Sequence, residues 1–539
     1  MKKRSTKPNL SESLKLSESY LQQPTSTPRF SVGEEHEQGG TRMGWYHELT
    51  FGKLGFILLV LLLLTSTSIA NNITVSQTAT LVEKDTSTHA LKVKFDLSWE
   101  NSWRTSSAPN NWDAAWVFIK YRVNGGDWKH ATLDSTLANF SVTNNNGIAT
   151  EFKPLNTGKG VFIYRANDGS GTNQWNGIKL PWKYGFDGVG DNDTIQVKVF
   201  AIEMCYVPQG SFYLGSGGSE IDHFYTYPTS TQTYQVTSEN EIIVGTSTGN
   251  LYYTNISYGG DQQGPIPALY PKGYNSFYCM KYEISQEQYA NFLNTLTATQ
   301  KSTRYSNFFN NIRYYIKLIN GIYGCDGNNN GILNESDDGQ NIACNYLSWV
   351  DGCAYADWSG MRPMTELEFE KACRGTLTPV ANEYAWGNTN IVQAIGITNP
   401  RQATEVTTPT NANCVYNNAS GVQGPVRVGN FARSGSTRES SGASYYGIME
   451  LSGNLWERPV TAGNTTGRSF TGLLGDGTLD ASGNSNVTNW PGIDAVGSGF
   501  RGGDWSDSSD YERVSDRLIA ASVYSDRLDN IGFRCCVTP

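Results

Sequence analysis

Apolar and polar residues alternate along the first part of the chain in the manner of β-strands. Residues 91–99 read LKVKFDLSW, and a period of two predicts a strand with one buried face. Segments 115–123 and 194–202 are also rich in β-branched and aromatic residues, and the NGGD sequence at 124–127 predicts a hairpin turn. Regularly spaced strands with turns between them predict a β-sandwich over residues 71–203.

The pattern changes after residue 203 to short helices separated by long polar loops. Ser285 with Gln288, and Thr365 with Glu368, have the spacing of capping boxes, and an apolar helical face follows each pair. The 56 glycines and a hydrophobic content of 38% favour short strands and long loops over a long helical architecture. We therefore expect a loop-rich α+β domain over residues 204–539.

A short apolar run, GFILLVLLLL followed by TSTSIA, is the clearest targeting signal. Lys53 precedes the run, and Ser68 and Ala70 are small residues where a signal peptidase cleaves. The run is shorter than the ~20 apolar residues of a membrane-spanning helix. We expect residues 43–70 to form a signal peptide, with a single-pass membrane anchor as the alternative, and residues 1–42 to form a disordered extension. Both alternatives predict a secreted or cell-surface protein.

The charge balance and the cysteines narrow the choice of partner. The net charge is -9 without a large basic block, which argues against a nucleic-acid partner because that affinity rests on clustered Lys and Arg. Nine cysteines in an exported chain permit disulfides, and the odd number leaves at least one unpaired. No CxxC spacing occurs, so a zinc site is not expected.

Several short motifs follow residue 204 in a defined order. They are YVPQGSFYLGS (206–216), FYCMKYEISQEQYANFLN (277–294), LSWVDGCAYADWSGMRPMTELEFEKACRG (347–375), YAWGN (384–388), GIMELSGNLWE (447–457), FRGGDW (500–505), RVSDR (513–517) and GFRC (532–535). This order resembles the formylglycine-generating enzyme, or sulfatase-modifying factor, family. The resemblance implies a C-type-lectin-like fold for residues 204–539.

The sequence differs from the family at the two cysteines that bind copper in its enzymes. Enzymes of this family bind copper through two cysteines, because soft thiolates select Cu(I). The corresponding stretch, residues 506–512, reads SDSSDYE and holds oxygen donors only. We therefore expect no copper site, and we keep a formylglycine-generating oxidase that modifies sulfatases as the alternative because the match of motifs is broad.

The segment from residue 504 to residue 530 has a different resemblance. Framework residues such as Arg513 and Arg517 alternate with short clusters of Ser, Asp, Tyr, Leu and Val. This layout resembles the variable region of target proteins of diversity-generating retroelements, which use the same lectin-like fold. Tyr offers rigid contact area and Ser and Asp offer adaptable hydrogen bonds, so the set suits ligand binding; an ordinary polar surface loop is the alternative. The predicted ligand contacts are Asp504, Trp505, Ser506, Asp507, Ser508, Ser509, Asp510, Tyr511, Glu512, Leu518, Ile519, Val523, Tyr524, Ser525, Asp526, Leu528 and Asp529.

An insertion at residues 325–338 contains the run DGNNNGILNESD, which matches a twelve-residue calcium loop. Gly331 supplies the sharp turn at the sixth position, and a plain Asn-Gly turn is the alternative. The predicted ligands are Asp326, Asn328, Asn330, the carbonyl of Ile332, Asn334 and Asp337.

The family resemblance implies a second calcium ion near the GNLWE motif. Transferred by position, Glu450 and Glu457 would supply side chains, and Gly453 and Leu455 would supply backbone carbonyls. A buried Glu457 beside Trp456 requires a cation or hydrogen-bond donors, so a hydrogen-bonded structural carboxylate is the alternative.

Together these features predict an exported ligand-binding protein with structural calcium. A glycan or another protein is the expected partner, and contact with a membrane is expected only if the segment 43–70 stays uncleaved. The alternatives from other classes are the oxidase and a structural module of a surface assembly.

Overall fold

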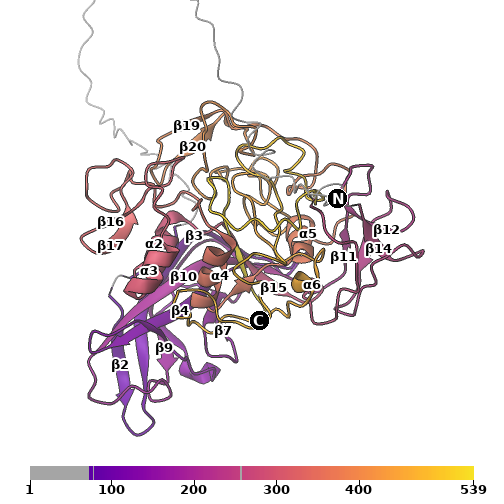
Figure 1. Ribbon diagram of the computed structural model, residues 1–539. Helices are drawn as coiled ribbons and strands as arrows, with labels where there is room; N and C mark the ends of the chain where they lie inside the picture. The colour runs from indigo at the N-terminus through magenta and orange to yellow at the C-terminus, as the bar shows by residue number, and fades with distance from the viewer. Residues whose placement is uncertain (1–71, 77, 255–257) are drawn as a thin grey trace, which may run out of the picture. The chain divides into compact units, whose positions relative to one another are not determined.

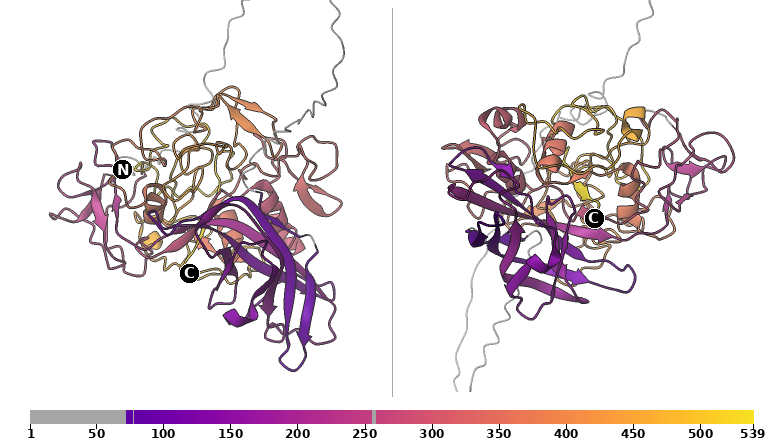
Figure 2. Two further views of the ribbon diagram at one scale, coloured as in Figure 1. Left: turned by 180° about the vertical axis from the view of Figure 1, so that it is seen from behind. Right: turned by 90° about the horizontal axis from the view of Figure 1, so that it is seen from below.

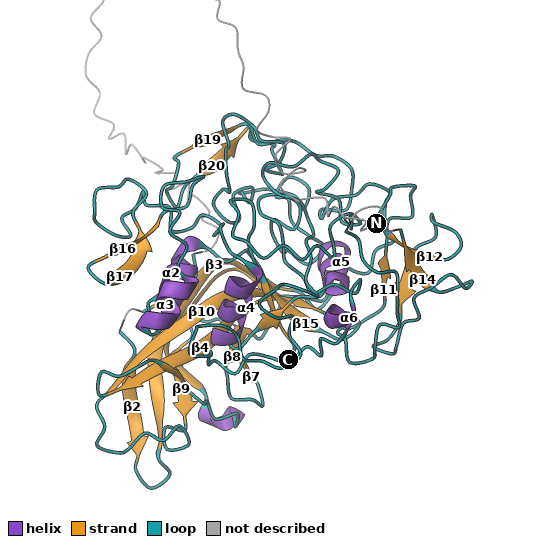
Figure 3. Cartoon of the chain, in the orientation of Figure 1, coloured by secondary structure: helices purple, strands orange, loops and turns teal. Residues whose placement is uncertain are grey.

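The computed structural model describes residues 72–76, 78–254 and 258–539. The predicted extension (1–42) and targeting segment (43–70) lie outside the described residues. The described chain consists mostly of β-sheet and loops with a few short helices (Figure 3). Within it, every helix is too short or too polar to cross a bilayer.

Two large sheets dominate the N-terminal part, and all their strand pairs are antiparallel. The first has five strands in the order β1-β3-β9-β6, with β2 also beside β3. They are β1 (Thr74–Val75), β2 (Thr80–Asp85), β3 (Ala90–Arg104), β6 (Ser141–Asn144) and β9 (Gly169–Trp182). The predicted strand at 91–99 is confirmed within β3, where buried and half-buried residues alternate.

The second sheet has eight strands in the order β18-β21-β15-β10-β4-β8-β7, with β5 also beside β4. They are β4 (Asp113–Val123), β5 (Lys129–His130), β7 (Thr150–Pro154), β8 (Val161–Arg165), β10 (Ile195–Val207), β15 (Phe277–Met280), β18 (Arg362–Pro363) and β21 (Cys535–Val537). The sheet therefore joins strands from both ends of the described chain (Figure 1).

Strand β4 is buried on both faces, which explains its nearly continuous apolar sequence. Val117 and Ile119 pack in a cluster with β3 and β9 of the first sheet. Trp116 and Phe118 point the other way into a cluster that contains Trp358 of helix α4. Figure 2 shows the violet strands in this layered arrangement beside the helices.

Strand β10 connects the two predicted domains. It pairs with β4 from Ile195 opposite Val123 to Cys205 opposite Asp113, and with β15 from Met204 to Val207. The boundary predicted at residues 203/204 therefore falls inside a strand that belongs to both parts.

The helices of the described chain are short. They are the 3-10 turn η1 (Leu137–Asn139), α2 (Gln286–Leu293), α3 (Ala298–Arg304), α4 (Trp349–Trp358), α5 (Glu366–Arg374) and α6 (Thr465–Arg468). Of these, α2, α3, α4 and α5 begin with capping boxes. Both predicted capping boxes are confirmed, at the start of α2 and of α5. Two further boxes, which begin at Thr297 and Ser348, were not predicted; the second uses Asp351 where Glu or Gln is usual.

Four small hairpin-like sheets complete the regular structure. They pair β11 (Phe212–Leu214) with β13 (Tyr234–Val236), β12 (Phe224–Thr226) with β14 (Leu251–Tyr253), β16 (Ile316–Ile319) with β17 (Ile322–Cys325), and β19 (Gly396–Thr398) with β20 (Val406–Thr408). Long loops connect them (Figure 3).

Buried ion pairs hold the C-terminal segment (residues 500–534), which contains no helix or strand. Nη2 of Arg501 lies 2.9 Å from Glu370, and Nε of Arg517 lies 2.7 Å from Glu366. Nη1 of Arg501 also reaches Glu366, at 3.2 Å. These four side chains are fully buried. Glu366 and Glu370 are one turn apart on α5, so one helix face anchors two points of the segment.

The charges of this network are mutually compensated. Burial alone would raise the pKa of Glu366, but Arg517 and Arg501 outweigh burial and hold that pKa below its usual value. Glu366 also accepts hydrogen bonds from the Ala462 amide, at 2.7 Å, and the Thr461 hydroxyl, at 3.0 Å. Its carboxylate is therefore satisfied without water.

Two more arginines fix the end of the segment. Nε of Arg534 lies 2.6 Å from Glu457, and Nε of Arg527 lies 2.6 Å from Asp351 of α4. Arg534 also donates to the carbonyls of Met280 and Lys281, both at 3.0 Å. The segment is thus tied to α4, α5 and the sheet at several points.

We expect Arg517→Met to lower the free energy of unfolding by about 3–5 kcal/mol, because it leaves Glu366 buried with one arginine fewer. Arg513→Met is the matched control, since Arg513 makes a partly exposed ion pair with Asp510; its cost should be at most about 1 kcal/mol. Urea denaturation measures both. Equal costs for the two variants would show that the buried pair is not an anchor.

Candidate ligand-binding surface

An aromatic and aliphatic cluster forms the base of the predicted binding surface. Trp456, Phe500 and Ile531 are buried. Tyr511 meets Trp456 edge-on, with ring centroids 6.1 Å apart. The predicted contact residues that pack on this base are Tyr511, Ile519, Tyr524 and Leu528. The segment thus brings apolar members of the predicted set together around one core.

One cavity beside this base, here called the acidic cavity, has a volume of about 250 Å³. Its members of the predicted set are Ser508, Asp510, Tyr511 and Leu518. Glu220, Asp222 and Asp516 also line it. Burial, together with the nearby Asp222, raises the pKa of Asp516 to about 7. The carboxylates of the lining are those of Glu220, Asp222, Asp510 and Asp516, and Arg513, which pairs with Asp510, adds one positive charge.

A second cavity, here called the arginine cavity, has a volume of about 600 Å³. Its members of the predicted set are Tyr524, Ser525, Asp526 and Leu528. Arg304, Phe308 and Arg527 also line it. The arginine cavity falls within the range of small-ligand sites, roughly 300–1,000 Å³, and the acidic cavity lies slightly below it.

Three predicted contacts are buried, which corrects their assignment to the surface. Asp504 and Glu512 are completely buried and Trp505 is 6% exposed. Asp504 accepts hydrogen bonds from the Ser506 hydroxyl, at 2.7 Å, and from the Asn530 amide, at 2.6 Å. These three side chains therefore lie in the core beneath the accessible residues of the segment.

The other predicted contacts are at least partly accessible. Val523 is 49% exposed. Those that line neither cavity but remain half-buried are Ser506, Asp507, Ser509, Ile519 and Asp529. Asp507 accepts a hydrogen bond from the Trp456 indole at 3.0 Å, so it is tied to the aromatic base.

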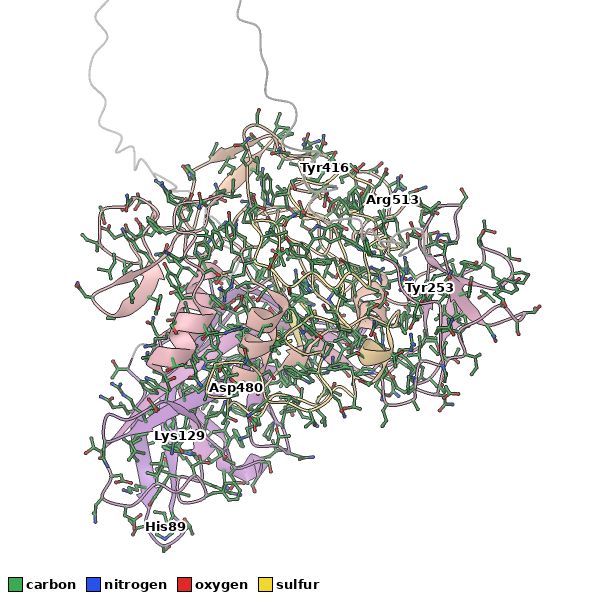
Figure 4. The ribbon with its side chains drawn as sticks, viewed as in Figure 1. His89, Lys129, Tyr253, Tyr416, Asp480 and Arg513 are labelled. Carbon is green, nitrogen blue, oxygen red and sulfur yellow. The ribbon has the colours of Figure 1, made fainter. Side chains whose placement is uncertain are left out.

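Several lining residues were not predicted. Glu220 and Asp222 come from a loop before β12, and Arg304 and Phe308 come from the end of α3 and the loop that follows it. These segments lie far from residues 500–534 in sequence and carry no motif that marks them. Figure 4 labels Arg513 within the loop-rich region, well apart from His89 in the β2–β3 turn and Lys129 in β5.

The predicted calcium loop forms hydrogen bonds within itself. Oδ1 of Asn334 accepts from the Cys325 amide at 2.9 Å, and Oδ1 of Asn330 accepts from the Ile332 amide at 2.8 Å. Oδ1 of Asn328 accepts from the Asn330 amide at 3.0 Å. These are the turn-forming contacts expected of Asn side chains, so the three amide oxygens are directed to the backbone.

A lysine supplies the positive charge at this loop. Nζ of Lys317 lies 2.7 Å from Oδ2 of Asp326 and 2.8 Å from Oδ1 of Asn329. Oδ1 of Asp337 accepts from the Asn328 side chain at 3.0 Å. All of the predicted side-chain ligands therefore lie on one hydrogen-bonded loop: Asp326, Asn328, Asn330, Asn334 and Asp337.

Glu450 and Glu457 lie in a buried carboxylate cluster. Glu457 pairs with Arg534, and Oε1 of Glu450 accepts from the Gly429 amide at 2.8 Å. The second oxygen of each has no hydrogen-bond partner. Burial raises the pKa of Glu450 to about 7. Arg534 is thus the donor that a buried Glu457 requires.

The amides of Gly453 and Leu455, whose carbonyls are the predicted calcium ligands, are hydrogen-bonded. The Leu455 amide donates to Oε1 of Glu283 at 3.1 Å, and the Gly453 amide donates to the carbonyl of Gly502 at 2.8 Å. In the part of the chain that the structure describes, no group of three or more His, Cys, Asp or Glu side chains has the arrangement of a metal site.

The cysteine side chains lie in the core. All nine cysteines are buried. Cys205 is opposite Cys279, and Cys279 is opposite Cys536, on three neighbouring strands. Cys414 lies close to Gly453, beside Glu512. Residues 506–512 themselves offer carboxylates, hydroxyls and a phenol, which do not fit the Cu(I) chemistry that the family resemblance implies.

Glu512 is the least satisfied group beneath the surface. Neither of its carboxylate oxygens has a hydrogen-bond partner with good geometry. Burial, and then the neighbouring Asp504 and Asp507, raise the pKa of Glu512 well above its usual value. The neutral carboxyl is therefore the form that the fold favours.

We expect Glu512→Gln to reduce the loss of stability with rising pH. The folded protein binds this proton more tightly than the unfolded chain, in which a glutamate titrates near about 4.3. The stabilisation is complete below that pH and is lost as pH rises through it toward the raised pKa. Urea denaturation from about pH 4 to about pH 8 should show a stability gain for the variant that grows with pH. The exposed Glu151→Gln is the control, and a pH-independent difference would contradict the assignment.

Comparison with known proteins agrees with the motif order. The sulfatase-modifying factor enzyme 1-like domain family matches residues 196–539. A formylglycine-generating enzyme from Thermomonospora curvata is 33% identical over 112 residues, which are 21% of this chain and 31% of that enzyme. The chain therefore spans under a third of that relative's length.

A solved structure is also similar. Treponema denticola variable protein 1 aligns with 63% of this chain and 96% of its own, at 14% identity and a TM-score of 0.29. That score is too low to support an argument about function or fold. The family match covers well over half of the sequence and includes every motif described above. The chain belongs to the sulfatase-modifying factor enzyme 1-like domain family.

Proposed function

We propose that this protein is an exported ligand-binding protein, in which the family domain presents a binding surface in place of a copper site. One observation carries the proposal. Four predicted contact residues line the acidic cavity and four line the arginine cavity, while arginines of the same segment are buried in ion pairs. Rigid backbone with accessible side chains between the anchors is the arrangement that a binding surface needs.

We also propose an architecture for each of the two parts of the chain. Residues 71–203 would form a β-sandwich, supported by the cluster that β3 and β9 share with β4 and β8. The family domain would have a C-type-lectin-like fold. The protein would act outside the cytoplasm, on a glycan or protein partner, as a receptor diversified in residues 504–529; a template repeat in the genome that differs only at adenines would support diversification.

The donor chemistry separates this proposal from the oxidase alternative. Residues 506–512 replace the expected sulfur ligands with oxygen, and Cys414 is a single thiol buried beneath them. Purified protein incubated with copper and a sulfatase peptide should show no formylglycine product. Turnover would overturn the binding proposal.

We also propose that calcium binds the loop at 325–338 and stabilises it. The Lys317 ammonium pairs with Asp326, and this positive charge at the loop supports a cation site there. A second calcium near Glu450 and Glu457 is supported by the unpartnered carboxylate oxygens there. Extracellular calcium concentrations suit weak sites of this kind.

We expect Tyr511→Ala and Tyr524→Ala each to weaken ligand binding by about tenfold or more, as truncation of aromatic anchors does. A glycan and protein array identifies the ligand, and titration measures the change. Tyr252→Ala, in β14 outside the segment, is the matched control. Full affinity in both surface variants, together with normal thermal unfolding, would exclude this surface.

We expect Lys317→Met to tighten calcium binding at the loop, because it removes the competing ammonium from Asp326. Replacing Asp326 and Asp337 together by alanine should abolish that binding event. Isothermal titration with calcium alone measures both effects. Identical calcium uptake by the wild type and the double variant would refute the loop site.

A further inference from the structure

The arginine cavity contains more donors than the protein itself satisfies. Arg304 is 5% exposed, and its Nε has no hydrogen-bond partner. Its Nη1 lies 3.1 Å from Asp351 but lacks hydrogen-bond geometry. Arg527 donates two hydrogen bonds to the carboxylate of Asp351, from Nε at 2.6 Å and from Nη2 at 2.7 Å. Two arginines therefore share one aspartate at this cavity.

A third arginine lies beneath the cavity wall. Arg458 is 2% exposed and donates to the Tyr524 carbonyl at 2.9 Å and to the Ser498 hydroxyl at 2.9 Å. Its guanidinium lies over the Phe500 ring at 4.1 Å. It takes part in none of the ion pairs found in the described part of the chain, and its Nε and Nη1 lack hydrogen-bond partners.

The ionisable side chains at the arginine cavity carry a net positive charge. Arg304, Arg458 and Arg527 face two carboxylates, the buried Asp351 and the exposed Asp526 at the rim. The N-terminus of α4, capped by Ser348, lies at the same cavity and adds a partial positive charge. One anionic group would balance the surplus.

The residues that line the arginine cavity indicate which class of molecule would bear the anionic group. The aromatic residues Phe308 and Tyr524 and the aliphatic residues Val350 and Leu528 line the cavity; Phe308 stacks on Tyr346 with one face. Thr303 and Ser525 are exposed hydroxyl residues at the same cavity. Aromatic faces with several hydroxyl groups around an open cavity suit a sugar ring more than an extended peptide, whose backbone would seek a strand edge.

We propose that the arginine cavity binds the carboxylate of an acidic sugar residue, with Arg304 as the residue that contacts the anion. The proposal rests on the proposed binding function and adds the ligand class. Arg304 is suited to this role because its planar guanidinium pairs with a carboxylate through two parallel hydrogen bonds. Arg527 satisfies both oxygens of Asp351, whereas Nε and Nη1 of Arg304 have no hydrogen-bond partner; because these two atoms are buried, the ligand's carboxylate reaches them only after the Arg304 side chain shifts toward the cavity.

Glucuronic acid and glucose form a matched pair of probes, since they differ only in the carboxylate. Titration followed by NMR should show glucuronic acid binding about tenfold more tightly than glucose, because a charge-assisted hydrogen bond is gained. Arg304→Met should remove that preference and leave the weak glucose affinity unchanged. Arg513→Met, which removes a charge at the acidic cavity instead, should keep the preference.

Other outcomes overturn the inference. Equal affinity for the two sugars in the wild type would do so, as would an unchanged preference in Arg304→Met. Tighter binding of N-acetylglutamate amide than of glucuronic acid would assign the cavity to acidic peptides instead. If Arg304→Met fails to fold by circular dichroism, Arg304→Gln, which keeps hydrogen-bond donors without the charge, replaces it. An array ligand that depends on Tyr511 or Tyr524, found alongside a negative sugar result, would leave the proposed binding function standing and remove only this inference.

Discussion

The buried ion pairs between α5 and the C-terminal arginines are the constraint on which the rest of the structure depends. Residues 500–534 contain no helix or strand, so only isolated β-bridges and single backbone hydrogen bonds, such as the bridges of Trp456 with Ile531 and of Glu457 with Arg501, add to the ion pairs that hold them. Arg501 and Arg517 reach Glu366 and Glu370 on one helix face, and Arg534 reaches Glu457. Burying such charges is costly unless each is paired and hydrogen-bonded, and here the Glu366 carboxylate is fully satisfied. An irregular segment thereby acquires a fixed course.

That fixed course separates two roles along the same sequence. The arginines point inward and determine where the backbone runs, whereas Ser508, Tyr511 and Tyr524 lie between the anchors on accessible surface. Substitutions at the accessible positions change the chemistry of the cavities and leave the ion pairs intact. Strand β10 extends this rigidity, because it joins the β-rich N-terminal part to the family domain within a single sheet.

Local signals in the sequence predicted the local structure well. The alternation at 91–99 predicted β3, and the pairs Ser285/Gln288 and Thr365/Glu368 predicted the starts of α2 and α5. Contacts between residues that are far apart in sequence left no comparable signal. Examples are the pairing of β10 with β15 beyond residue 203 and the arginine cavity, which both Arg304 and Tyr524 line. The burial of Asp504 and Glu512 also escaped prediction, because polar residue type favours exposure and their burial depends on contacts with distant parts of the chain, such as the hydrogen bond from Asn530 to Asp504.

Amide hydrogen exchange tests the central claim most directly, because it measures the rigidity of an irregular segment without knowledge of a ligand. The amides of Trp505, Val514 and Ala520, which donate to backbone carbonyls within loops, should exchange as slowly as those of β10, since all would require global unfolding. Rapid exchange of these three amides beside a protected β10 would show that the ion pairs do not hold the segment, and the account of a preorganised binding surface would be contradicted.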